Sequence, residues 1–136
     1  MGVLFPSDAW VKAFMAVLNN SAAYEEAAKT WEGDFHFVVE PGGSLTEPVT
    51  LYMDLWHGKC RDAYQVTDGH AAAPAFRLNA PVATWKKVLL KQLDPIQGMM
   101  TGQLKLKGNM AIIMKSVKAA KELVSCSTLV ETDFPV

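Results

Sequence analysis

Hydrophobic residues near the N-terminus recur at the spacing of an amphipathic helix. They form a stripe at positions i, i+4, i+7 and i+8, made of Trp10, Phe14, Val17 and Leu18. Ser7 precedes this stripe and is a favourable N-cap residue, so we expect the first helix to begin there. The polar run Asn19-Asn20-Ser21 interrupts the stripe, and a shorter helix is predicted from Ser21 to about Lys29.

The next part of the chain alternates hydrophobic and polar residues with the period of two that is typical of half-buried strands. The alternation is cleanest over residues 49–56, and further strands are predicted over 35–40 and, more weakly, over 60–66. Turn signals separate or close these strands. They are Pro41-Gly42-Gly43-Ser44, His57-Gly58-Lys59 and Asp68-Gly69. The three strands are therefore expected to form an antiparallel meander.

A short fourth strand and a third helix follow. Phe76 and Leu78 mark the strand, which Ala80-Pro81 ends. The helix is predicted from about Pro81 to Gln92, with one apolar and one basic side. The apolar side consists of Val82, Trp85, Val88 and Leu89, and the basic side of Lys86, Lys87 and Lys91.

Residues 94–115 combine several helix and strand signals in one stretch, DPIQGMMTGQLKLKGNMAIIMK. Asp94-Pro95 predicts the start of a short helix and Gly102 its end. Alternation over 103–107 predicts a fifth strand, and Asn109 is expected to cap a last helix that runs to about residue 124. Residues 125–136 are predicted to form a tail. Because the strands are mostly grouped rather than alternating with helices, this order indicates an α+β layer fold.

Length and composition restrict the class of protein. At 136 residues the chain is predicted to be one domain, with its core in residues 7–124. A net charge of −1 argues against a nucleic-acid surface, which is usually strongly basic. The sequence has no apolar run near the roughly 20 residues of a membrane span and no secretory signal pattern. Cys60 and Cys126 follow no metal or redox spacing, so a reduced, cytoplasmic location is expected.

Residues suited to catalysis or metal binding are scattered along the chain. His36, His57 and His70 have no metal-ligand spacing and lie on or beside separate strands. The sequence contains no nucleophile elbow, phosphate loop or dinucleotide fingerprint. The role of Asp94 as a helix cap explains that residue sufficiently. We therefore predict that the protein is not an enzyme, with no catalytic residue, no bound metal and no cofactor.

Four of the seven methionines lie within residues 94–115: Met99, Met100, Met110 and Met114. Methionine fills irregular apolar space and adapts to variable shapes. Taken alone, these residues are most simply interpreted as core packing, because apolar helical stripes usually face a core. The other interpretation is that they wall a soft apolar cavity.

Several motifs of the C-terminal third occur together in one known family. They are Asp94-Pro95, Gly102-Gln103-Leu104-Lys105-Leu106, Gly108-Asn109-Met110 and Met114-Lys115, preceded by Trp85 with Leu89 and Leu90. With these motifs, and with its order of elements from residue 7 to about residue 124, the chain resembles the sterol carrier protein 2 domain family. The N-terminal half resembles that family only in its pattern.

The resemblance implies a five-stranded, mainly antiparallel sheet covered by helices, with an apolar tunnel that holds a lipid. Members of the family bind fatty acids, acyl-CoA esters, phospholipids or sterols, and most have no catalytic activity. At its C-terminus the chain has Phe134-Pro135-Val136 where peroxisomal members carry a targeting tripeptide, so a stand-alone prokaryotic member is expected. It also departs from the family at Met99-Met100-Thr101, where many members carry an aromatic pair and a glutamine.

On this basis we expect a non-catalytic intracellular lipid-binding and transfer protein that holds a fatty-acyl or related lipid. The residues expected to bind it are Phe76, Leu78, Trp85, Leu89, Ile96, Met99, Met100, Thr101, Leu104, Leu106, Met110, Ile113, Met114 and Val117. The alternative is an accessory module that presents lipid to, or dimerises with, a separate lipid-metabolising enzyme. The basic side of the helix over 81–92, with Lys105 and Lys107, is either solvated surface or a contact for an anionic membrane. The identity of the lipid and homodimerisation stay open, and nucleic acid is not an expected partner.

Overall fold

The computed structural model describes residues 2–67 and 73–135, which form six helices and seven strands. The helices are α1 Asp8–Asn19, α2 Ala22–Ala27, α3 Val82–Leu89, α4 Pro95–Met100, α5 Met110–Met114 and α6 Val117–Ser127. The strands are β1 Val3–Leu4, β2 Glu32–Glu40, β3 Val49–Trp56, β4 Lys59–Gln65, β5 Phe76–Pro81, β6 Lys105–Lys107 and β7 Thr132–Asp133. The turn predicted at Asp68-Gly69 lies outside the described residues.

Four helices begin at polar residues that the sequence predicts as caps. In each, a side-chain oxygen accepts a hydrogen bond from a backbone N–H of the first turn, which has no partner within the helix. The capping residues are Ser7, Ser21, Asp94 and Asn109, with N···O distances of 3.1, 3.1, 2.8 and 3.0 Å. The predicted starts of α1, α2, α4 and α5 are therefore confirmed.

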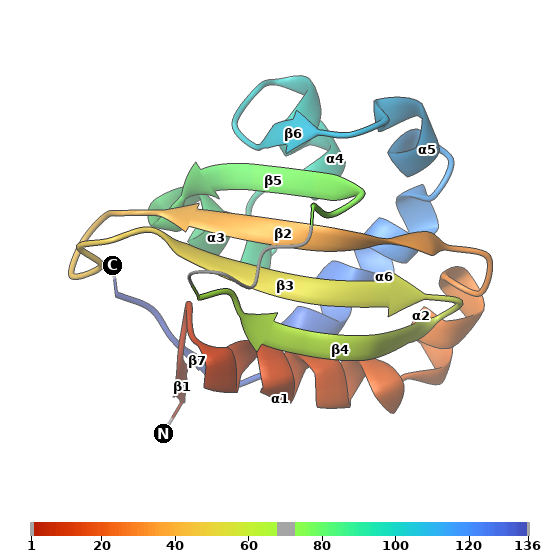
Figure 1. Cartoon of the computed structure of the whole chain (residues 1–136), viewed down its shortest axis with the longest axis horizontal. Coiled ribbons are helices and arrows are strands. Elements are labelled where there is room, and N and C mark those ends of the chain that lie inside the picture. Colours follow the sequence, from red (N-terminus) through yellow and green to blue (C-terminus); the bar gives the residue numbers. More distant parts are fainter. Residues whose placement is uncertain (1, 68–72, 136) are drawn as a thin grey trace.

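Five strands form one mixed sheet in the order β4-β3-β2-β5-β6. The strands β2, β3 and β4 are the predicted antiparallel meander, β5 runs parallel to β2, and β6 runs antiparallel to β5. In Figure 1, α3 and α6 lie behind this sheet and α1 runs along its β4 side, while none of the described helices covers its front face. The predicted α+β fold with a mainly antiparallel five-stranded sheet is confirmed.

The alternation along the strands directs one set of side chains toward the helices. The residues of this set lie opposite one another across the sheet, because the strand registers bring them into the same rows. Two of these rows are Phe76–Phe35–Met53 and Leu78–Phe37–Leu51. All of these side chains except that of Phe37, which is partly buried, have less than a tenth of their surface exposed. The apolar core therefore lies on this inner face of the sheet.

The helix predicted from Asn109 to about residue 124 consists of two helices. α5 ends at Met114, and the Ser116 N–H donates to the Ile113 carbonyl at 2.9 Å in a tight turn before α6 begins. Ser116 has φ −122° and ψ 33°, which is outside the helical region. The turn changes the chain direction so that Ile113 of α5 and Ala119 of α6 are both buried. Apolar periodicity continues across the break and so could not reveal it.

The two ends of the chain also differ from the prediction. α6 continues to Ser127, so the tail begins later than Ser125. The segment Val3–Leu4, which periodicity does not predict as a strand, pairs in parallel with Thr132–Asp133. Since Trp10 Nε1 also donates to Thr132 Oγ1 at 2.9 Å, both terminal segments are attached to α1.

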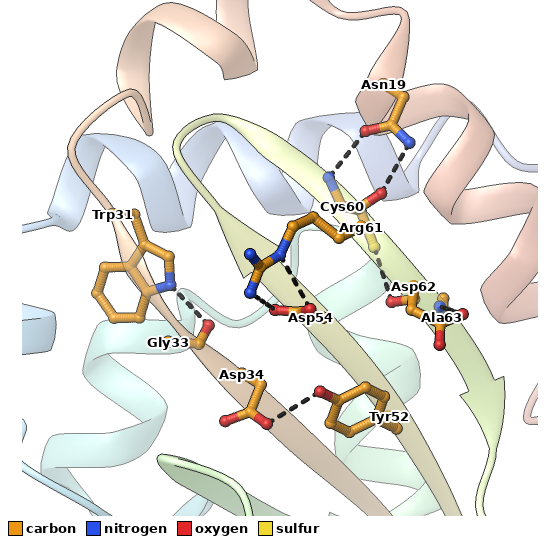
Figure 2. A network of polar contacts seen from close by, with 10 residues as sticks. All are labelled: Asn19, Trp31, Gly33, Asp34, Tyr52, Asp54, Cys60, Arg61, Asp62 and Ala63. Atoms are coloured by element: carbon orange, nitrogen blue, oxygen red, sulfur yellow. Dashed lines mark hydrogen bonds and ion pairs between the residues drawn. The ribbon is translucent and has the colours of Figure 1, made fainter.

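A side-chain clamp joins the end of α1 to the start of β4. Asn19 Nδ2 donates to the Cys60 carbonyl at 2.9 Å, and Asn19 Oδ1 accepts from the Cys60 N–H at 2.8 Å (Figure 2). The clamp lies beside the irregularity of the sheet, where the register between β3 and β4 shifts at Asp54 and Leu55. Because Cys60 is buried, water cannot readily replace the amide as the partner of these two backbone groups.

We predict that Asn19→Ala lowers the free energy of unfolding by about 1–3 kcal/mol, because it leaves two backbone groups of Cys60 unpaired. Urea unfolding followed by circular dichroism would measure this change. Asn20→Ala is the matched control, since the Asn20 side chain makes only a local, exposed hydrogen bond to the Ala16 carbonyl. Equal destabilisation by the two substitutions would contradict the role of the clamp.

Candidate functional site

An apolar cavity of about 110 Å³ lies between the inner face of the sheet and the helices. Its wall consists of Phe5, Trp10, Phe14, Tyr24, Trp31, Phe35, Phe37, Leu51, Leu55, Leu78, Trp85, Val88, Leu89, Pro95, Met99, Leu104, Ile113, Ser116, Ala119, Ala120, Leu123, Val124 and Ser127. The space is several times the roughly 10–15 Å³ that one water needs on the same measure. A wall of this kind offers water few hydrogen-bond partners and therefore favours hydrocarbon.

Eight of the wall residues are aromatic. The ring of Trp31, which directly precedes β2, stacks on that of Phe35 with centroids 5.8 Å apart, and the rings of Phe35 and Phe37 on β2 stack with centroids 5.2 Å apart. The ring of Phe37 then meets the ring of Trp85 on α3 edge-on at 5.7 Å. These four side chains form a continuous row of rings, which makes one side of the cavity rigid as well as apolar.

The three tryptophans of the wall use their indole N–H groups within the protein. Trp10 donates to Thr132 Oγ1 at 2.9 Å, Trp31 to the Gly33 carbonyl at 3.0 Å, and Trp85 to the Val38 carbonyl at 3.1 Å. Figure 2 shows the bond between Trp31 and Gly33. Because all three donors are paired, the rings present mainly apolar surface to the cavity.

Helix α6 supplies the opposite side of the cavity with small side chains. Ala119, Ala120 and Ser127 line the wall from this helix, and Ser116 lines it from the turn before it. The Ser127 hydroxyl donates to the Val124 carbonyl, so it is engaged by its own helix. Small residues at these positions leave space that larger side chains would occupy.

Six of the fourteen residues predicted to bind lipid line this cavity. They are Leu78, Trp85, Leu89, Met99, Leu104 and Ile113. The other eight are not part of its wall: Phe76, Ile96, Met100, Thr101, Leu106, Met110, Met114 and Val117. Phe76 and Ile96 are buried elsewhere in the core, whereas Met100 and Met114 are 70% and 43% exposed.

The wall of this cavity is mainly aromatic, and most of the methionine cluster lies outside it. Met99 is the one member of the methionine cluster that lines the cavity. Because α4 and α5 have only six and five residues, each turns one face to the core and leaves the other exposed. The sequence indicates that Trp10, Phe14 and Phe35 are buried, but it does not indicate that they surround a space.

The front face of the sheet carries a polar network (Figure 2). The Tyr52 hydroxyl donates to Asp34 Oδ2 at 3.0 Å. Arg61 donates to both carboxylate oxygens of Asp54, at 3.0 and 3.1 Å, and its guanidinium lies 4.5 Å from the centroid of the Trp56 ring. In each pair the polar groups meet their hydrogen-bonding needs across neighbouring strands, so we assign these pairs a structural role.

His36 is buried on this same face, between Arg77 and Tyr52. Its Nδ1 lies 3.5 Å from Arg77 Nη2, and its ring meets the Tyr52 ring edge-on at 5.8 Å. Burial and then the positive charge of Arg77 lower the pKa of His36, with a smaller opposing effect from Asp34. The neutral imidazole is therefore the form that the fold favours.

Other groups with catalytic potential are also engaged in structure. Burial raises the pKa of Cys60 to about 12, which keeps its thiol protonated, and Cys126 is buried as well. His57 Nε2 lies 2.6 Å from Glu32 Oε2 at the surface. His70 lies outside the described residues. Within residues 2–67 and 73–135, no group of three His, Cys, Asp or Glu side chains could hold a metal ion.

The sequence pattern of the SCP-2 sterol transfer family matches residues 12–121. The chain belongs to this family. A crystal structure of sterol carrier protein 2 is 38% identical to this SCP-2 family chain, with a TM-score of 0.79, and the match covers 91% of this chain and 97% of that one. A conserved hypothetical protein from Thermus thermophilus, described as possibly a sterol carrier protein, is also 38% identical, with a TM-score of 0.82 and coverage of 92% and 88%.

More distant similarity supports the fold alone. Sterol carrier protein 2 from Yarrowia lipolytica, in its apo form, is 16% identical with a TM-score of 0.60, and the match covers 87% of this SCP-2 family chain and 88% of that one. No curated protein matches the chain significantly. Among the helices of the described residues, none has the length and apolar character needed to cross a membrane.

We predict that His36 makes the stability of the protein depend on pH below about 6.5, the usual pKa of histidine in an unfolded chain. As the pH falls through this value, the unfolded state binds a proton that the folded state resists, because the folded pKa is lowered. Stability is therefore lost as the pH falls, by at most about 1.4 kcal/mol per pH unit for one proton.

Urea unfolding at several pH values between neutrality and mild acid would test this, with His36→Asn expected to flatten the dependence. His57→Asn is the control, because it removes an exposed histidine from the turn between β3 and β4. An unchanged slope in His36→Asn would contradict the prediction.

Proposed function

We propose that the protein binds a single-chain lipid in the apolar cavity and carries it without catalysing a reaction. The observation that carries this proposal is the aromatic and aliphatic cavity itself, found in a chain of the SCP-2 sterol transfer family. The structure of a sterol carrier protein 2, 38% identical and covering 91% of this chain, supports the same assignment.

Hydrophobic transfer gives such a ligand enough free energy to bind. Each buried methylene contributes about 0.8 kcal/mol, so ten of them contribute roughly 8 kcal/mol before the costs of ordering are subtracted. A dissociation constant of about 1 μM corresponds to a similar value. A lipid chain longer than ten methylenes therefore gains more transfer free energy than micromolar binding requires, and the excess offsets the entropy lost on ordering.

The proposed contacts combine the predicted residues with the row of rings on β2. Leu78, Trp85, Leu89, Met99, Leu104 and Ile113 are the predicted residues that we retain as lipid contacts. Trp31, Phe35 and Phe37 are added to them because they form the rigid side of the same wall. A fatty-acyl chain is the proposed ligand, since a narrow flexible chain can enter between packed side chains more easily than a fused ring system.

The polar side chains of the wall support a role without catalysis. They are Tyr24, Ser116 and Ser127, apart from the indole groups already paired. Burial is the main cause that raises the pKa of Tyr24, so its hydroxyl stays neutral. Within the described wall, no carboxylate, imidazole or amine is present to act as a general acid or base. The two buried thiols, Cys60 and Cys126, fit a reduced compartment such as the cytoplasm.

One observation favours the second candidate, an accessory role beside a lipid-metabolising enzyme. Met100, Ile112 and Met114 are 70%, 44% and 43% exposed on α4 and α5, an unusual set of large apolar side chains at a surface. A partner protein or a second copy could cover them. The two candidates differ in whether the purified protein contains lipid.

We predict that native mass spectrometry of the purified protein detects one lipid per chain. Organic extraction followed by lipid mass spectrometry would identify the ligand as a fatty-acyl compound, a phospholipid or a sterol. A protein that is empty and dimeric, and that takes up no added fatty acid, would contradict the carrier and favour the accessory role.

We predict that Ala120→Phe weakens fatty-acid binding by about tenfold or more, because the new ring occupies space that the ligand requires. Ala120 lines the cavity from α6. The stability of the variant should be unchanged or higher, since the ring fills an apolar void. Ala83→Phe on the exposed side of α3 is the matched control. Equal fatty-acid affinity of the two variants would contradict the proposed location of the ligand.

A further inference from the structure

A second, more polar pocket of about 290 Å³ adjoins the apolar cavity. It lies between the connection from α3 to α4 and the middle of α6, and Lys91, Leu93, Asp94, Lys121 and Ser125 line it. Pro95 and Val124 line both this pocket and the apolar cavity. The two spaces are therefore neighbours and share these two side chains.

The charges in this pocket favour an anion. Among residues 2–67 and 73–135, neither the Lys91 nor the Lys121 ammonium group has an ion-pair partner. The pocket also holds one carboxylate, that of Asp94, whose Oδ1 caps α4 by accepting from the Ile96 N–H at 2.8 Å and the Gln97 N–H at 3.4 Å. Two lysines against one carboxylate give this pocket a net positive charge, directly beside the apolar cavity.

The distribution of charged residues along the chain also favours anion binding at this pocket. Nine of the thirteen basic residues, but only four of the fourteen acidic ones, follow residue 72. The part of the chain that forms the polar pocket is therefore positively charged, although the whole protein carries a net charge of −1. Such a field attracts negatively charged ligands toward the pocket.

The backbone conformation of Lys91 allows its side chain to be removed without disturbing the fold. Lys91 has φ +60°, in the left-handed region, directly after the C-cap residue Leu90. Glycine is the residue that this position usually carries at the end of a helix. Lys91→Gly therefore removes the ammonium group while relieving backbone strain, so the variant is expected to fold.

We infer that Lys91 and Lys121 bind the anionic headgroup of a single-chain lipid whose hydrocarbon chain lies in the apolar cavity. A carboxylate or a phosphate meets this requirement, because each accepts charge-assisted hydrogen bonds from ammonium groups. The inference rests on the proposed function and extends it, since it assigns the class of headgroup and the end of the cavity where the headgroup lies.

The test uses cis-parinaric acid and its methyl ester, two fluorescent probes with the same chain and different head charge. At neutral pH and low salt, the wild-type protein should bind the acid about tenfold more tightly than the ester. In Lys91→Gly with Lys121→Gln, the acid should lose about this factor while the affinity for the ester is unchanged.

The matched control is Lys87→Gln with Lys118→Gln, which removes the same amount of charge from α3 and α6 but from lysines outside both pockets. It should retain most of the preference for the acid. If the pocket variant keeps the preference, or if the control loses it equally, the headgroup assignment is overturned while the carrier function stands.

Two further outcomes distinguish the remaining possibilities. If neither the acid nor the ester binds the wild-type protein, the proposed function fails and the headgroup assignment fails with it. Inorganic phosphate at millimolar concentration is added as a competitor and should not displace the acid, because most of the affinity comes from the chain. If inorganic phosphate displaces cis-parinaric acid, the pocket is a site for a free anion, and the assignment of a lipid headgroup to it is overturned.

Discussion

The register of β2 is the constraint on which the sheet, the cavity and the front face all depend. This strand lies between β3 and β5, so two sets of hydrogen bonds hold it in place. Because side chains alternate, Phe35 and Phe37 face the helices while His36 faces Arg77 and Tyr52 on the other side. A shift of one residue would place the histidine in the cavity wall and the aromatic rings on the front face.

One side of the cavity is closely packed and the opposite side is left open by small residues. The row of rings on β2 is tightly stacked, whereas α6 opposes it with Ala119 and Ala120. The break at Ser116 allows α6 to take its own direction, independent of α5. An empty apolar cavity lowers the stability of a protein, so a bound hydrocarbon chain would stabilise this fold at the same time as it is carried. The N-terminal half supplies most of the rings, and the basic C-terminal half supplies the polar pocket beside them.

The sequence predicted those features that depend on residues close together in the chain, such as the starts of helices. Ser7, Asp94 and Asn109 cap their helices because the first N–H groups of any helix need partners. For the candidate site, six of the predicted lipid-binding residues line the cavity, whereas Met100 and Met114 are exposed. A short helix has several apolar residues but only one face toward the core, and composition does not identify that face.

Local sequence signals were sufficient for the five strands of the main sheet, for the inward and outward faces of β2 and β3, and for the resemblance to the family, but not for β1, β7 or the break between α5 and α6. These depend on periodicity, on capping and on motifs within a few residues of one another. The packing of the elements, by contrast, is what brings eight aromatic side chains from separate segments around one space. The same packing brings Lys91 and Lys121, thirty positions apart in the chain, into one pocket beside that space. A cavity is the volume left between elements after they pack, so it is a property of their relative positions and of no single segment.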